Sequence, residues 1–249
     1  MKLTYRLISL YFSKEMKAEF HRVLSAWSSY YKHLGKRQQR EFLVRTLRFH
    51  YTTAFNSTPD FEVTQEMMIV ISSAFVQITF GLSADTLSMF RKIFIAPTSY
   101  SYKGTKLLFD GDVNIATRQV NLSWPAVEQG FVVTDNGVNL AIHEFGHCLI
   151  IEQMHPRSRV TFFSERKLNV WRDLAMNQLP LIRSGHTTLF RGYGGFNLME
   201  LFSVSMESFF EQPDEFYSAS PVFYRSMADL LKQDPRQRSN PRKHWKLSA

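Results

Sequence analysis

The chain of 249 residues contains two histidines four positions apart, His143 and His147, and Glu144 directly follows the first. In an α-helix, residues four positions apart lie on one face, so both imidazoles can point toward the same metal ion. The carboxylate of Glu144 can then lie next to a water molecule held by that ion. Histidine ligands, an open coordination position and a carboxylate base are typical of zinc hydrolases.

The helix that carries this motif is expected over residues 138–154, where apolar side chains occur nearly all round. Such a helix is buried, and its polar side chains need partners because unpaired buried polar groups are costly. Metal ligation would satisfy both histidines, although hydrogen bonds from core histidines to carbonyls remain an alternative. Gly146 costs about 1 kcal/mol of helix propensity relative to Ala. It therefore predicts the close approach of another backbone, such as a strand.

A catalytic zinc site normally has three protein ligands, so a third must be found. The long metalloprotease signature has a glycine and a third histidine where this chain has Ile150 and Gln153, which excludes that class. Glu152 falls off the ligand face, and His155 lies at the expected end of the helix. His186, in a later loop, is a weak candidate.

Stronger candidates for the third ligand lie on another predicted helix. Asn197 can cap its start, and Glu200 and Glu207 are seven residues apart, so they share one face. Glu200 is the preferred ligand, although it could instead close a capping box. Glu207 could bind the metal or orient a ligand histidine. Tyr193, on a glycine-rich loop, could donate its hydroxyl to an oxyanion or be an ordinary tyrosine.

The elements around these residues predict an α+β fold. Helices are expected over residues 13–34, 36–51 and 64–81, with Thr64 as a cap, and strands over 92–96, 106–109 and 118–124. We therefore expect a small mixed sheet plus the motif helix, with a helical N-terminal half; the family resemblance described below implies that this core is a zincin-like metallopeptidase core.

Residues 1–235 are expected to form one domain, in which the N-terminal helices, up to about residue 90, pack on the catalytic core. Residues 236–249 are expected to be a basic, flexible tail, because the stretch from 233 onward holds five Lys or Arg and one Asp. A solvated tail is the preferred interpretation. A nucleic-acid-binding arm is the alternative, so nucleic acid is not among the expected partners.

Composition limits the class of protein. The chain is 44% hydrophobic and has a formal net charge of +8, so it can bury a substantial core. A single cysteine, Cys148, excludes internal disulfides and multi-cysteine zinc sites, and favours a cytoplasmic location. No apolar run reaches the roughly 20 residues of a membrane span.

Several segments in collinear order resemble the Mlc titration factor A family of zinc metallopeptidases, which is itself similar to the catalytic domain of anthrax lethal factor. The resemblance covers most of the chain from about residue 25. The residues that carry it are 63–67, the strand at 120–124, 139–147 with the HEFGH core, Tyr193, 200–210 and 233–235.

The resemblance implies that His143, His147 and Glu200 bind one zinc ion per chain, with Glu144 as general base and Tyr193 as a transition-state donor. The expected function is hydrolysis of peptide bonds in a peptide or protein substrate, as an aminopeptidase or an endopeptidase. A strand from residues 106–124 could bind the substrate by main-chain hydrogen bonds. The alternative is a regulatory protein that sequesters a transcriptional repressor and has a mainly structural zinc site.

Overall fold

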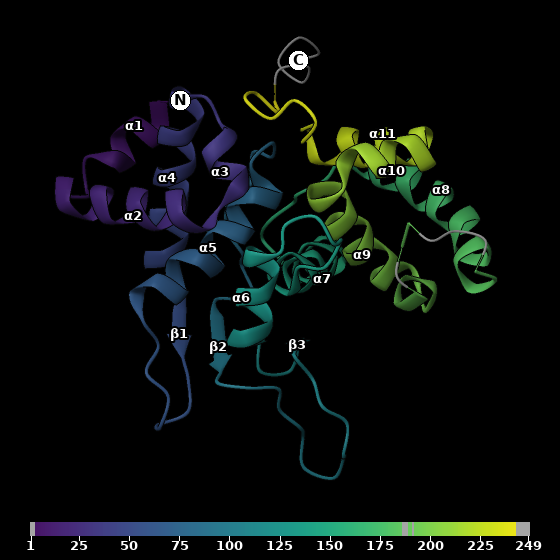
Figure 1. Ribbon diagram of the computed structural model, residues 1–249, viewed down its shortest axis with the longest axis horizontal. Helices are drawn as coiled ribbons and strands as arrows, with labels where there is room; N and C mark the ends of the chain where they lie inside the picture. Colours follow the sequence, from purple (N-terminus) through teal and green to yellow (C-terminus); the bar gives the residue numbers. More distant parts are fainter. Residues whose placement is uncertain (1–2, 186–188, 191, 243–249) are drawn as a thin grey trace.

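The computed structural model describes residues 3–185, 189–190 and 192–242, and it consists of many helices and one small sheet, whose strands lie at the lower end of the view in Figure 1. Helices α1 to α5 lie on one side of the molecule and α8 to α11 on the other, with α6 and α7 between them. The helices are α1 (Leu3–Ser9), α2 (Lys14–Trp27), α3 (Ser29–His33), α4 (Lys36–Tyr51), α5 (Gln65–Thr79), α6 (Trp124–Val132), α7 (Leu140–Met154), α8 (Glu165–Arg183), the 3-10 turn η1 (Gly192–Gly195), α9 (Leu198–Glu211), α10 (Pro213–Ala219) and α11 (Pro221–Leu231).

In the described part of the chain, four strands form one mixed sheet. They are β1 (Ala54–Asn56), β2 (Lys92–Ala96), β3 (Gly111–Asn114) and β4 (Gln119–Ser123), in the order β1-β2-β4-β3. The β1–β2 and β2–β4 pairs are parallel, and β3 pairs antiparallel with β4 at the sheet edge. The predicted α+β class, with a small mixed sheet, the motif helix and a helical N-terminal half, is confirmed.

Three predicted elements differ from the structure. The helix expected over 13–34 is broken at Ser28, whose extended backbone and side-chain bond from the Tyr31 amide begin α3 instead. The strand expected over 106–109 is wrong, because only Phe109 makes a bridge there, with Tyr100. The strand expected to reach Trp124 ends one residue earlier, where Trp124 begins α6.

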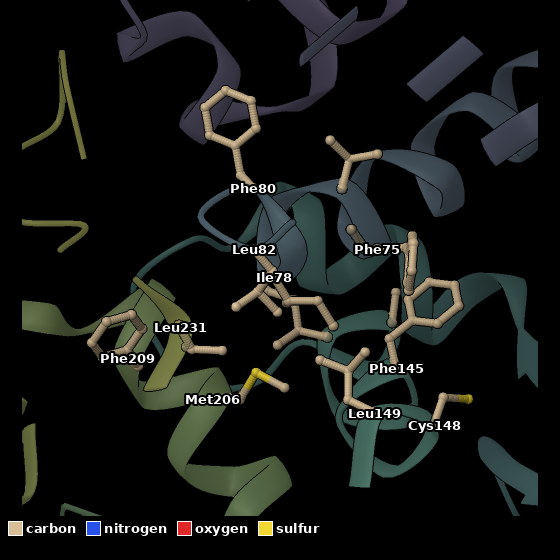
Figure 2. Packing of buried hydrophobic residues seen from close by; sticks show 14 of the residues in the cluster. Phe75, Ile78, Phe80, Leu82, Phe145, Cys148, Leu149, Met206, Phe209 and Leu231 are labelled. Carbon is tan, nitrogen blue, oxygen red and sulfur yellow. The ribbon is translucent and has the colours of Figure 1, made fainter. Parts of the chain in front are cut away.

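The core forms where α5, α7, α9 and α11 meet (Figure 2). The ring of Phe145 on α7 lies 5.4 Å from that of Phe75 on α5. Helix α7 is enclosed by α5, α6, α9 and β3, and this explains why apolar residues occur nearly all round it.

Gly146 allows α9 to approach α7 closely. A Cβ added to Gly146 would lie 2.8 Å from Oγ and 3.2 Å from Cα of Ser203. The neighbouring backbone is therefore a helix and not the strand that the sequence suggested. The close approach itself is as expected.

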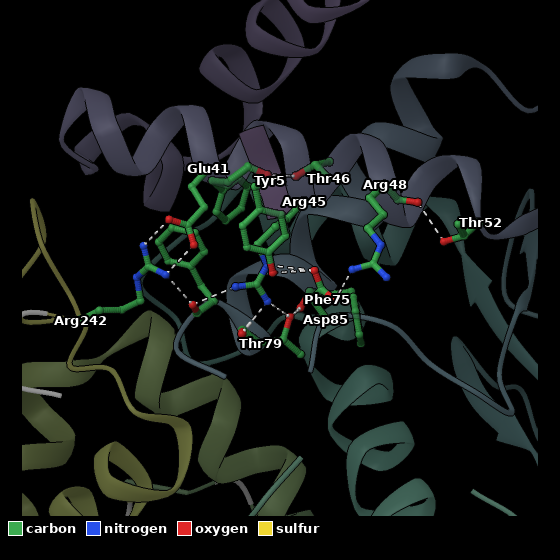
Figure 3. A network of polar contacts seen from close by, with 12 residues as sticks. Tyr5, Glu41, Arg45, Thr46, Arg48, Thr52, Phe75, Thr79, Asp85 and Arg242 are labelled. Atoms are coloured by element: carbon green, nitrogen blue, oxygen red, sulfur yellow. Dashed lines mark hydrogen bonds and ion pairs between the residues drawn. The ribbon is translucent and has the colours of Figure 1, made fainter. Parts of the chain in front are cut away.

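A polar network holds the N-terminal helices together (Figure 3). Arg45 on α4 is buried and donates to the carbonyls of Thr79 and Phe80 at the end of α5, at 2.7 and 2.9 Å. Asp85 accepts from Tyr5 and Arg48, at 2.8 and 2.7 Å. These contacts join α1 and α4 to the segment after α5.

The first residues of the expected tail contact the N-terminal helices. Arg242 forms an ion pair with Glu41 on α4 at 2.8 Å, and the Gly35 amide donates to the Ser239 carbonyl. Residues 243–249 lie outside the described residues. The division of the chain into one domain and a flexible tail stays a prediction.

None of the helices in the described residues is long and apolar enough to cross a membrane.

Candidate metal centre

Both motif histidines lie on α7, whose first turn is capped by the side chain of Asn139. The Asn139 side chain accepts a hydrogen bond from the Ile142 amide at 3.1 Å and so fixes the start of the helix. His143 and His147 follow on one face, and both are buried. Their Nε2 atoms face each other at 3.1 Å.

Glu200, on α9, is the third candidate ligand. Asn197 caps that helix by accepting from the amides of Met199 and Glu200 at 2.8 and 2.9 Å. The Glu200 carboxylate turns toward α7, with Oε2 3.3 Å from His143 Nε2 and 3.5 Å from His147 Nε2. One ligand atom from each of these three residues lies within 4.8 Å of the other two.

The donor set fits a metal ion. Two neutral imidazole nitrogens at 3.1 Å repel each other unless a proton or a cation lies between them. Glu200 Oε2 is buried beside them without a hydrogen bond of good geometry. Two nitrogens and one carboxylate oxygen that converge in this way could hold one divalent cation.

Glu207 contacts the first motif histidine from the other side of its ring. Its Oε2 is 3.2 Å from His143 Nδ1, and its Oε1 accepts from the Asn139 amide at 2.9 Å. Glu207 is therefore separated from the cluster by the imidazole ring. This position favours an orienting role for Glu207 over the ligand role that the sequence left open.

The charges around His143 are strongly coupled. Burial lowers the pKa of its imidazole, but polar contacts with the Glu200 and Glu207 carboxylates outweigh burial and raise that pKa to about 10. Burial raises the pKa of Glu200, but polar contacts with His143 and His147 outweigh it and lower the pKa to about 2. The site therefore favours a positive charge between the histidines and the carboxylate.

Glu144 lies beside the cluster and against the edge strand of the sheet. Burial raises the pKa of its carboxyl group to about 8, and its Oε2 has no hydrogen-bond partner among the described residues. A Cβ added to Gly111 on β3 would come within 2.8 Å of Glu144 Oε1. Only a residue without a side chain leaves this space for the carboxylate.

The sequence did not identify Gly111 as part of the site. Nothing in the local sequence around Gly111 shows that this residue lies against α7. The next residue, Asp112, accepts from the hydroxyl of Tyr102 at 2.8 Å. This contact holds the segment before β3 near the strand.

The other candidate residues do not join the cluster. Glu152 accepts from the Ser88 and Met89 amides at 3.0 and 2.6 Å, so its role is structural. His155 is half-buried at the C-terminal cap of α7, and its Nδ1 accepts a hydrogen bond from the Arg157 amide. His186 and the side chain of Tyr193 lie outside the described residues, although the Tyr193 backbone is part of η1, which packs against α9.

Comparison with known proteins supports a metallopeptidase function. The chain matches a family model described as glucose-regulated metallo-peptidase M90 over residues 5–232. No match is found among curated proteins. The match spans both helices of the cluster and supports a metallopeptidase that uses a metal ion. The chain belongs to the glucose-regulated M90 metallopeptidases, as its resemblance to the Mlc titration factor A family predicted.

Proposed function

We propose that the protein is a zinc-dependent peptidase in which His143, His147 and Glu200 hold one zinc ion. The spacing of the ligand atoms carries this proposal. Tetrahedral ligands with bonds of about 2.0–2.1 Å lie roughly 3.3–3.4 Å apart. The three candidate atoms are separated by 3.1, 3.3 and 3.5 Å.

Glu144 is proposed as the general base. When bound, zinc supplies a Lewis acid that lowers the pKa of a water molecule and polarises a carbonyl group. Glu144 would accept the proton of that water and later donate it to the nitrogen of the leaving amine. Its buried carboxylate, with a raised pKa and one oxygen without a partner, suits both transfers.

The substrate is proposed to lie along β3. This strand is at the edge of the sheet, and its first residue, Gly111, contacts Glu144. A peptide added to the edge would be held by main-chain hydrogen bonds, with its scissile bond near the base. Tyr193 would then donate its hydroxyl to the developing oxyanion.

Metal content and turnover together test the proposal. Wild type, purified without a metal-affinity tag, should hold about one zinc per chain and cleave peptides. Glu200→Ala should lose the metal, whereas Glu144→Gln should keep it and lose turnover by about 10²-fold or more. Wild type that holds no zinc after incubation with the metal, or Glu144→Gln with full turnover, would overturn the proposal.

Further assays with the same proteins test the type of peptidase and the regulatory alternative. Substrates with free and blocked N-termini distinguish an aminopeptidase from an endopeptidase. The regulatory alternative, sequestration of a transcriptional repressor, predicts that Glu144→Gln keeps the biological effect. A cytoplasmic site of action is also proposed, and the single buried cysteine, Cys148, supports it.

A further inference from the structure

Three large apolar side chains project into solvent where α1 ends. Leu7, Leu10 and Tyr11, here called the N-terminal knuckle, are 56%, 79% and 86% exposed. Backbone hydrogen bonds from the amides of Leu10 and Tyr11 to the preceding turn hold the knuckle in shape. Phe12 points inward instead and stacks on Tyr51 at 5.6 Å. Adjacent exposed apolar side chains of this size mark an interaction surface.

A basic cavity adjoins the knuckle. It has a volume of about 610 Å³. Ser9, the residue directly before Leu10, is one of the residues that line it. Lys17, Lys36 and Arg40 supply its positive charge, from α2 and α4. Leu43 and Val44 form an apolar part of its wall. The cavity therefore suits an anionic group attached to an apolar body.

Among the described residues, no acidic side chain forms an ion pair with the cations of this cavity. No ion pair between described side chains includes Lys17, Lys36 or Arg40. On α2, Glu19 is bound to Arg22 at 2.8 Å. Glu15 lies in the first turn of α2, where hydrogen bonds with its own backbone and with Ser13 engage its carboxylate.

We propose that this end of the molecule docks on an anionic lipid surface. Leu10 and Tyr11 would enter the boundary between headgroups and acyl chains, where leucine and tyrosine side chains are favoured. The cavity cations would bind headgroup phosphates, which attract basic side chains to an anionic surface. Apolar side chains beside the cations favour lipid over nucleic acid, because nucleic acid offers no apolar layer for the knuckle.

Vesicle sedimentation of the full chain tests this proposal. Wild type should bind vesicles of phosphatidylcholine with 30% phosphatidylglycerol, not bind phosphatidylcholine alone, and dissociate as salt rises. Leu10→Ser/Tyr11→Ser and Lys36→Glu/Arg40→Glu should each weaken binding by about tenfold or more. Matched controls on α8, at the other side of the molecule, are Val170→Ser/Met176→Ser and Arg166→Glu/Arg172→Glu, which should bind as wild type does.

A fluorescent label supplies an independent measurement. Cys148 is fully buried, so a cysteine introduced by Leu10→Cys can be labelled selectively with a polarity-sensitive dye. Its emission should shift to the blue on anionic vesicles, whereas a label at Met176→Cys should not respond. Absence of vesicle binding by wild type at low salt would overturn the proposal. So would equal loss in the α8 controls, or binding to duplex DNA but not to vesicles.

Discussion

The carboxylate of Glu207 on α9 lies 3.2 Å from Nδ1 of His143 on α7, while Nε2 of the same ring faces His147 and Glu200. A proton on Nδ1 donated to this carboxylate leaves the Nε2 lone pair free for a metal. The same carboxylate accepts from the Asn139 amide, so Glu207 also fixes the start of α7. One buried side chain thus sets both the helix position and the ring orientation.

We expect Glu207→Gln to weaken zinc affinity by about 10–100-fold without unfolding the protein. The amide keeps the shape but loses the charge that holds the Nδ1 proton. Competition with a chelator of known affinity would measure the change. Glu211→Gln is the matched control on α9, because Glu211 contacts Asn139 and not His143. Equal affinities of Glu207→Gln and wild type would exclude the orienting role.

Gly111→Ala should lower turnover while zinc content stays normal. The added Cβ would lie 2.8 Å from Glu144 Oε1 and 2.7 Å from Leu140 Cδ1, so the proposed base must move. A displacement of this kind can cost about 10²-fold in rate. Gly35→Ala is the control, since its Cβ would meet only an ordinary contact at 3.4 Å. Unchanged kcat in Gly111→Ala would show that Glu144 need not occupy this position.

Gly146→Ala should destabilise the fold through the contact between α7 and α9. Overpacking costs about 1–3 kcal/mol, partly offset by about 1 kcal/mol of helix propensity. Ser203 Oγ, the nearest atom at 2.8 Å, has no hydrogen-bond partner among the described residues. Ser203→Ala should therefore relieve part of the loss in the double variant. Urea unfolding of both single variants and the double variant measures this coupling, and strict additivity would contradict the proposed contact.

Local signals predicted the parts of the site that lie within single helices. The four-residue spacing of His143 and His147, and the caps at Thr64 and Asn197, depend only on nearby residues, and the structure shows each on its expected helix. The sequence favoured Glu200 over Glu207 as the ligand, but their spacing alone could not separate the two, because both share one face of α9. Their roles depend on how α9 is rotated against α7.

Contacts between segments far apart in the sequence could not be predicted from the neighbouring residues. The contact of Gly111 with Glu144 depends on how the sheet edge packs on α7, and no neighbouring residue in the sequence signals that packing. The strand expected at 106–109 has the right residue types, yet its Leu107 and Leu108 are exposed, because no neighbouring strand pairs with them in the described structure. Strand propensity depends on such pairing.

The last prediction concerns pH and the buried carboxyl group of Glu211. Burial, the largest effect, and the negative charges of Glu207 and Asp135 raise its pKa from 4.5 to about 8, against a hydrogen bond from Asn139 that lowers it. Between pH 4.5 and 8 the folded protein therefore holds a proton here that the unfolded chain has lost. The contribution to the free energy of unfolding is fully present below pH 4.5 and is lost as pH rises toward 8.

Glu211→Gln removes this dependence because the amide does not titrate. Relative to wild type, the variant should gain stability as pH rises from 5 to 8, with a slope of at most about 1.4 kcal/mol per pH unit. Urea unfolding of both proteins at several pH values measures the difference. Glu128→Gln, at an exposed position on α6, should give a curve parallel to that of wild type. Parallel curves for Glu211→Gln as well would show that Glu211 is ionised in the folded protein.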